Sequence, residues 1–193
     1  DIKEWVSVPL WDACEGGVVL WDPRVGEVRW FSQSEGTGWS KRVSARGGPV
    51  SLRDIEKYLR KMGRLEVGPD YLSRGIDYRA VARRYRPLFS DHHPLATELR
   101  CEDRNTVWLR MFNTEDDPLG RSREWLRVAW HQEDLAVLFP IGFTPFVFTE
   151  STALGVLLMP DGSEALTVVE LGELVPLFSQ GGENDSNRKE SKG

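Results

Sequence analysis

The sequence of 193 residues has few cysteines and no long apolar run. Cys14 and Cys101 stand far apart in a chain of ordinary domain size, so disulfides are neither needed nor indicated. The longest apolar stretch, 135–148, is broken by proline and glycine and falls short of the roughly 20 residues of a membrane helix. The N-terminus lacks the basic-then-apolar pattern of a secretory signal. We expect a cytoplasmic or nuclear protein without membrane contact; a secreted protein with one bridge is the alternative.

Familiar catalytic motifs are missing as well. The chain contains no Gly-x-Ser-x-Gly, no phosphate-binding P-loop and no dinucleotide-binding Gly-x-Gly-x-x-Gly. Neither cysteine stands in a recognised nucleophile context. The sequence therefore predicts no catalytic residue, no metal ligand and no cofactor, and it favours a protein that is not an enzyme.

What the sequence does have is an uneven distribution of charge. Residues 41–86 hold 13 Lys and Arg against 5 Asp and Glu, a balance of +8, whereas the rest holds 12 against 25, a balance of -13. All four tyrosines fall in the same basic block. Such a block is neutralised either by the acidic surface of the protein itself or by an anionic partner.

The N-terminal region has the pattern of a β-hairpin followed by a loop. Alternating apolar residues at 17–22 and 27–31 flank a Pro/Gly turn, which predicts two paired strands. The segment 32–49 is rich in glycine and serine and predicts a mobile loop.

Two helices are predicted in the basic block. Ser51 and Asp54 form a capping-box pattern before an apolar periodicity that predicts a helix over 52–62, with Gly63 as its C-cap. Asp77 is the expected N-cap of a second helix that ends before Pro87. Its spacing separates two faces, one with Tyr78, Val81 and Tyr85 and the other with Arg79, Arg83 and Arg86.

From Thr97 onward the apolar residues recur with period two, which indicates an antiparallel sheet. The expected strands are 107–112, 125–130, 135–139, 146–149, 154–159 and 165–169, followed by a helical turn within 171–178. Residues 180–193 contain no apolar side chain and predict a disordered polar tail. We expect one globular α+β domain over 1–179, mainly antiparallel β-sheet, with a two-helix basic insertion at about 51–86.

The preferred function from these patterns is binding of an anionic partner, with nucleic acid, RNA or DNA, placed first. Lys and Arg neutralise phosphates, and aromatic rings stack on unpaired bases. The expected site comprises Lys41, Arg42, Arg46, Arg79, Arg83, Arg84 and Arg86, with Trp39 and Tyr71 as stacking residues. The competing interpretation is that the arginines pair with carboxylates of the same domain, and the low isoelectric point of about 5.3 agrees with a small footprint.

A protein-interaction adaptor is the alternative function. The arginines of the second helix suit an acidic or phosphorylated protein segment, and eight tryptophans provide candidate interface anchors. Five of them fall in expected strands and are assigned to the core, namely Trp21, Trp30, Trp108, Trp125 and Trp130, which leaves Trp5, Trp11 and Trp39 as surface candidates. A Trp-rich domain with a polar tail would also suit a viral accessory protein.

One short segment resembles an enzyme family. Ser90-Asp-His-His-Pro94 is similar to the Asp-His-His signature of the DHH phosphoesterases, which implies manganese bound by Asp91, His92 and His93 and attack of water on a phosphodiester. The chain has none of the Asp-x-Asp elements that accompany the motif in that family. A metal-dependent phosphoesterase is therefore kept as a remote alternative.

Overall fold

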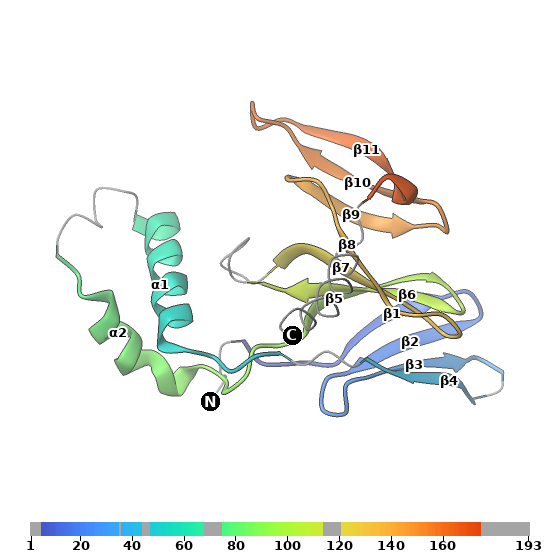
Figure 1. Cartoon of the computed structure of the whole chain (residues 1–193), viewed down its shortest axis with the longest axis horizontal. Coiled ribbons are helices and arrows are strands. Elements are labelled where there is room, and N and C mark those ends of the chain that lie inside the picture. Colours follow the sequence, from blue (N-terminus) through green and yellow to red (C-terminus); the bar gives the residue numbers. More distant parts are fainter. Residues whose placement is uncertain (1–4, 35, 44–46, 68–74, 114–120, 175–193) are drawn as a thin grey trace, which may run out of the picture.

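The computed structural model describes residues 5–34, 36–43, 47–67, 75–113 and 121–174. Within these ranges eleven strands form three antiparallel sheets, and two α-helices lie between β4 and β5 in the chain (Figure 1). The expected sheet-dominated α+β class is confirmed at this level. Among the described residues, no helix has both the length and the apolar character needed to span a bilayer. The predicted polar tail lies outside the described residues.

The first sheet has the order β1-β2-β3-β4 and contains the predicted hairpin. Its strands are β1 (Leu10–Cys14), β2 (Gly17–Asp22), β3 (Glu27–Ser32) and β4 (Gly36–Arg42). Strand β4 corrects the expectation of a loop at 32–49. Gly38, which suggests a loop in the sequence, lies in β4 directly beneath the indole of Trp30, where any Cβ would clash with that ring. The glycine thus makes room for a large side chain on the sheet.

The second and third sheets carry most of the predicted C-terminal strands. The second has the order β5-β6-β7-β8 and the third the order β11-β10-β9. Their bounds are β5 (Ala96–Asp103), β6 (Thr106–Phe112), β7 (Arg121–Ala129), β8 (Leu135–Leu138), β9 (Phe143–Phe148), β10 (Thr152–Leu158) and β11 (Glu164–Glu170). The final helical turn is a short 3₁₀ element, η3 (Leu171–Glu173).

The second sheet lies between the other two, so both of its faces are buried (Figure 1). On one face Val107 and Leu109 pack with Val28 of the first sheet. On the other face Trp108 stacks on Phe148 of the third sheet, with ring centroids 4.6 Å apart. The alternation of β6 is thus apolar on both sides, which is typical of a strand covered by two layers.

The helices have their own small core beside the sheets. Helix α1 (Leu52–Val67) begins with the predicted capping box, in which the Ser51 backbone N–H donates to Asp54 at 2.9 Å and the Asp54 N–H donates to Ser51 Oγ at 3.2 Å. It passes through Gly63 and ends at Val67, so the predicted C-cap is wrong. The core of this region consists of Trp5, Val50, Ile55, Ala82 and Phe89.

Helix α2 (Tyr78–Tyr85) starts at its predicted N-cap and continues into the 3₁₀ turn η2 (Arg86–Leu88). The carboxylate of Asp77 accepts hydrogen bonds from the backbone N–H groups of Arg79 and Ala80, both at 3.0 Å. Tyr78 packs inward as expected, but Tyr85 is exposed and Ala82 takes the buried position instead. Tyr85 shares the stripe of Tyr78, seven positions earlier, but it is the last residue of the helix and is exposed there.

Candidate functional site

Lys41 does not belong to an open anion site. Its Nζ lies 2.6 Å from a carboxylate oxygen of Asp134 and donates hydrogen bonds to the carbonyl oxygens of Ala129 and Gln132 at 2.8 and 2.6 Å. The ammonium therefore ties β4 to the connection between β7 and β8. Its expected role in binding an anion is corrected to a structural one.

Trp39 is buried rather than presented for stacking. Only 6% of it is exposed, its Nε1 donates to the carbonyl oxygen of Arg104 at 2.7 Å, and its ring stacks on Trp130. The expectation that Trp39 contacts a base is therefore wrong. Two further predicted residues, Arg46 and Tyr71, lie outside the described residues.

Arg86 is held by its own chain segment. Its guanidinium donates to the carbonyl oxygens of Phe89 and Ser90, both at 3.2 Å, and to a carboxylate oxygen of Asp91 at 3.0 Å. These contacts close the turn that follows α2. Arg86 is thus occupied by these contacts and does not join the exposed arginines of α2.

Arg42 is exposed at the end of β4, directly opposite Glu27 of β3. The pKa of Glu27 is lowered by hydrogen bonds from Arg29 and from Ser40, and the positive charge of Arg42 adds to this effect. Arg42 therefore already stands beside an acidic side chain of the same sheet.

Three predicted residues do lie together on an open surface, and we call them the α2 arginine face: Arg79, Arg83 and Arg84. All three are exposed, whereas Tyr78 and Ala82 of the same helix are buried. None of them makes an ion pair with a side chain that the structure describes. This face therefore leaves three positive charges exposed on α2.

Many arginines elsewhere in the described structure, unlike those of the α2 arginine face, pair with a carboxylate. The pairs are Arg29–Glu27 at 2.7 Å, Arg60–Glu56 at 2.8 Å, Arg100–Glu98 at 2.5 Å and Arg127–Glu102 at 2.7 Å. Glu102 is buried and binds Arg127 through both oxygens, which raises the pKa of that guanidinium. Within the basic block itself, Lys41, Arg60 and Arg86 lie against carboxylates, as the competing interpretation expects for these three residues. Among the described side chains, the residues of the α2 arginine face do not.

Two residues of the Asp-His-His segment contact side chains of the helical region. Asp91 binds Arg86, His92 is exposed, and His93 Nε2 lies 3.4 Å from Asp54 at the start of α1. Partial burial raises the pKa of Asp54, but hydrogen bonds from Ser51 and His93 outweigh it and lower this pKa overall. Within the described ranges, no three His, Cys, Asp or Glu side chains are grouped as metal ligands.

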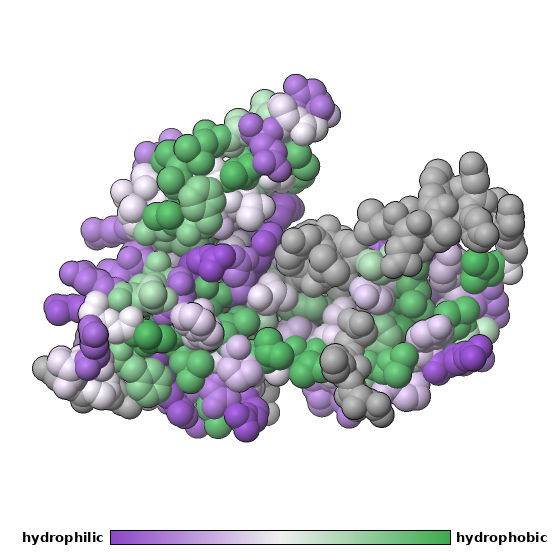
Figure 2. Space-filling model, turned by 180° about the vertical axis from the view of Figure 1, so that it is seen from behind, coloured by the Kyte–Doolittle hydropathy of each residue, from purple (hydrophilic) through white to green (hydrophobic). Residues whose placement is uncertain are grey.

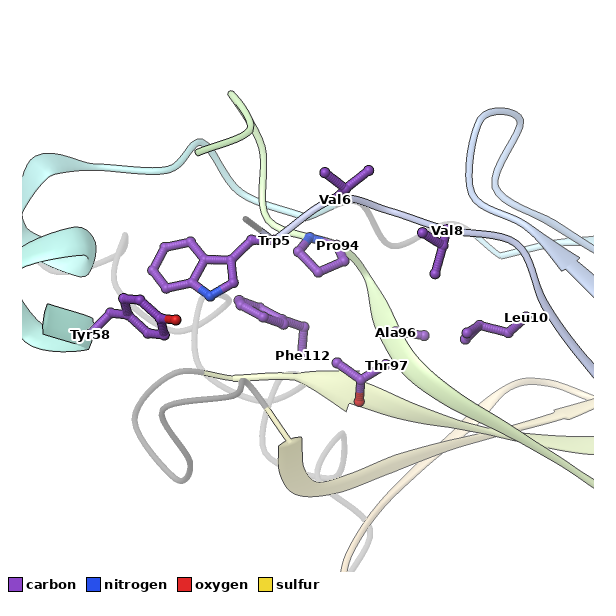
Figure 3. Close-up of a pocket in the computed structure, with 9 residues that line it drawn as sticks. All are labelled: Trp5, Val6, Val8, Leu10, Tyr58, Pro94, Ala96, Thr97 and Phe112. Atoms are coloured by element: carbon purple, nitrogen blue, oxygen red, sulfur yellow. The ribbon is translucent and has the colours of Figure 1, made fainter. Parts of the chain in front are cut away.

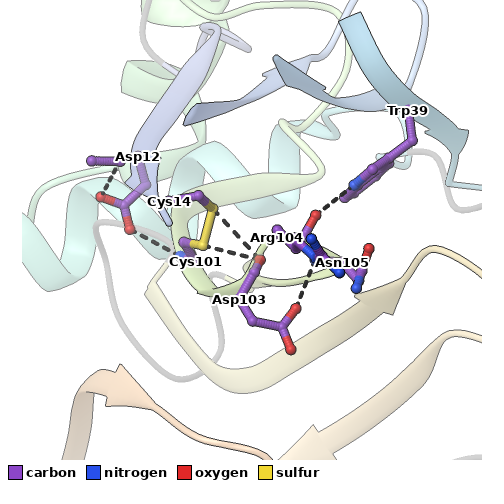
Figure 4. Close-up of a disulfide and its surroundings, with 8 residues drawn as sticks. Asp12, Cys14, Trp39, Cys101, Asp103, Arg104 and Asn105 are labelled. Atoms are coloured by element: carbon purple, nitrogen blue, oxygen red, sulfur yellow. Dashed lines mark hydrogen bonds between the residues drawn. A yellow bond between two sulfur atoms is a disulfide. The ribbon is translucent and has the colours of Figure 1, made fainter. Parts of the chain in front are cut away.

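The two cysteines form a disulfide, which the sequence neither required nor indicated but which its one-bridge alternative included (Figure 4). Cys14 of β1 and Cys101 of β5 are separated by 87 positions in sequence, and their Cα atoms lie 5.6 Å apart. Asp12 reinforces the same junction, since its carboxylate accepts a hydrogen bond from the Cys101 N–H at 2.9 Å. The bridge joins the first sheet to the second. The sequence offered no sign of it because strand β1 was not predicted.

A pocket of about 260 Å³ lies where the N-terminal segment crosses between α1 and β5 (Figure 3). Trp5 and Tyr58 close one end and Val8 and Leu10 the other. The described residues that line it include no Asp, Glu, His, Lys, Arg or Cys. The hydroxyl groups of this lining are those of Tyr58 and Thr97.

Of the surface tryptophans expected from the sequence, only Trp11 is confirmed, with 70% of it exposed. Trp5 joins Trp39 among the buried residues and packs in the helical core. Trp21, Trp108 and Trp125 are buried as expected, while Trp30 and Trp130 are partly buried against the same core.

Sequence reasoning missed one exposed apolar surface, on the third sheet. Leu166 and Val168 of β11 are 71% and 58% exposed and lie between Glu164 and Glu170. The signal was present in the strand prediction, because alternate residues of a strand share a face and this face reads Glu-Leu-Val-Glu. Comparisons with protein-family models, curated proteins and solved structures find no match.

Proposed function

We propose that this chain is a non-enzymatic binding protein and that the α2 arginine face recognises an acidic segment of a partner protein. The observation that supports it is the exposure of Arg79, Arg83 and Arg84 without an ion-pair partner among the described side chains. Arg79 and Arg83 stand four positions apart, a spacing that makes side chains neighbours on a helix. Guanidinium groups bind carboxylates and phosphates through paired hydrogen bonds, so the face suits glutamate, aspartate or phosphoserine.

An acidic protein segment is favoured over nucleic acid for two reasons. Three arginines form a small footprint beside the roughly 6 to 10 phosphate contacts that DNA-binding proteins make. A disulfide is typical of proteins in oxidising compartments, and this favours such a compartment over the cytoplasm or nucleus. Binding of RNA or DNA is therefore an outcome of the test and not the proposal itself.

The test compares the wild-type chain with the triple variant Arg79→Glu, Arg83→Glu and Arg84→Glu. Fluorescence anisotropy at low salt measures binding of an oligo-glutamate peptide, a single-stranded RNA and a duplex DNA. We expect the peptide to bind, to dissociate as salt rises, and to lose affinity at least about tenfold in the triple variant, because attractive charges become repulsive.

The matched control is Arg24→Glu with Arg104→Glu, since both residues are exposed but lie outside α2. Its affinity should stay close to that of the wild type, and circular dichroism should show that all variants keep their fold. Absence of peptide binding by the wild type would overturn the proposal, as would equal loss in the control. Tighter binding of RNA or DNA that depends on the same three arginines would replace the acidic protein by a nucleic acid.

A further inference from the structure

The outer face of the third sheet is apolar although the inner face already completes the core. Phe143, Phe148 and Ala153 point inward and are buried against Trp108 and Trp125 of the second sheet. The residues between them along each strand point the other way. The apolar side chains of the outer face are therefore not used by the fold of the described chain.

Strand register gathers these side chains into one patch. Leu166 stands opposite Val156, and Val168 stands opposite Leu154, which in turn stands opposite Val147. Directly opposed residues point to the same face and contact one another, so the five side chains are contiguous across all three strands. Figure 2 shows apolar side chains gathered on the upper lobe, which is the β9–β11 sheet in Figure 1.

The charges that the third sheet itself carries are all of one sign. Glu164 and Glu170 are exposed on the same face as Leu166 and Val168, one at each end of the row, about 20 Å apart at the usual rise of a strand. From residue 128 to residue 174 the sequence holds seven Asp and Glu and no Lys or Arg. The patch is thus an apolar centre between two carboxylates in a negative field.

We infer that the outer face of the β9–β11 sheet is a second docking surface, and that its partner is a polypeptide segment with an apolar centre and Lys or Arg at both ends. Exposed apolar patches of this kind mark interaction sites, and the two glutamates define the partner's charge. An amphipathic helix would meet both of them with basic residues about 13 positions apart, at a rise of 1.5 Å per residue.

The same charges argue against the other occupants of an apolar surface. A second copy docked through the same face would place Glu164 and Glu170 against their own counterparts, and like charges across an interface are unfavourable. An anionic membrane surface would be repelled in the same way, since lipid recognition of this kind uses Lys and Arg. A cationic amphipathic segment is the occupant that satisfies both the apolar centre and the acidic ends.

The probe is a synthetic amphipathic helical peptide with leucines on one face and lysines at both ends, compared with a peptide of the same composition in scrambled order. Isothermal titration measures binding to the full chain at low salt. We expect the ordered peptide to bind, and we expect Leu166→Asp with Val168→Asp to abolish binding, because charge in the centre of the patch must be desolvated. Both side chains are exposed, so the fold should persist.

Charge reversal tests the two glutamates at the ends of the patch separately from its apolar centre. Glu164→Lys with Glu170→Lys should weaken binding at least about tenfold and reduce its salt dependence. The matched control is Glu15→Lys with Glu133→Lys, two exposed carboxylates outside the third sheet, which should leave affinity nearly unchanged. The triple arginine variant of α2 should bind this peptide normally, so the failure of either docking surface is distinguishable from failure of the other.

Several results would overturn the inference. One is equal binding of the ordered and scrambled peptides, and another is wild-type affinity in the glutamate-to-lysine variant. Binding to vesicles of phosphatidylcholine with phosphatidylserine, lost in the Leu166 and Val168 variant, would assign the face to a membrane. Dimerisation in sedimentation equilibrium that the same variant abolishes would assign it to a second copy.

Discussion

The α2 arginine face and the outer face of the β9–β11 sheet are opposite in chemistry and different in construction. The first is a polar surface on a short helix whose buried side is only Tyr78 and Ala82. The second is an apolar surface on a sheet whose inner side packs against two tryptophans. The uneven charge along the chain thus becomes an uneven charge in space. A surface can thus be open because nothing neutralises its charge or because nothing covers its apolar side chains.

The largest expected effect comes from loss of the disulfide that joins the first sheet to the second. Replacing Cys14 and Cys101 by serine, or reducing the wild type, should lower the free energy of unfolding by about 4 to 5 kcal/mol, the chain-entropy value for a loop of this length. Urea unfolding followed by tryptophan fluorescence measures it. The double variant should be insensitive to reductant. If reductant leaves the wild-type midpoint in place, the bridge does not stabilise the junction of the first two sheets.

A second prediction separates the surfaces. Phe148→Ala removes the ring stacked on Trp108 and should cost about 3 to 5 kcal/mol, the usual range for a buried phenylalanine. Hydrogen exchange should increase in β9, β10 and β11 more than in α1 and α2. Binding of the amphipathic peptide should fall, whereas binding of the oligo-glutamate peptide should persist. Equal loosening of the sheet and the helices would mean that the two regions unfold as one unit.

The smallest expected effect concerns pH and acts on the helices alone. Hydrogen bonds lower the pKa of Asp54 below its ordinary value of 3.8, so its contribution to stability is complete above that value. The contribution is lost as the pH falls through the lowered pKa of the folded state, where the carboxylate takes up a proton. Thermal unfolding followed by helical circular dichroism should show this loss in the wild type. Asp54→Asn should reduce the acid sensitivity, and an unchanged pH profile in this variant would contradict the assignment.

Local signals in the sequence predicted the local structure well. The capping box of Ser51 and Asp54, the N-cap Asp77 and the alternation of β6 were all recognisable, because each depends on residues close in sequence. The end of α1 was wrong because the continuing helix overrides the preference of Gly63 to terminate it. Strand β4 was missed because Gly38 suggests a loop in the sequence, whereas in the structure it leaves room for the indole of Trp30 on β3.

The candidate site was harder to predict, since it depends on contacts between distant segments. Lys41 looked like an open cation, but Asp134 meets it from the far end of the chain. Trp39 looked exposed because its partner Trp130 is distant in sequence, in the turn that follows β7. Arg79 and Arg83 of the predicted arginine face are exposed on α2, whereas Arg86 of the same predicted face is held by Asp91.

The placement of the second sheet between two others has a consequence for synthesis of the chain. One face of β6 can be covered as soon as β1–β4 have been made, but the other face, with Trp108, has its cover in residues that follow Phe143. Until those residues leave the ribosome, the indoles of Trp108 and Trp125 stay exposed to water and to other nascent chains. A fragment that ends after β8 would therefore expose Trp108 and Trp125 and be prone to aggregate. The third sheet protects the second sheet from such contacts.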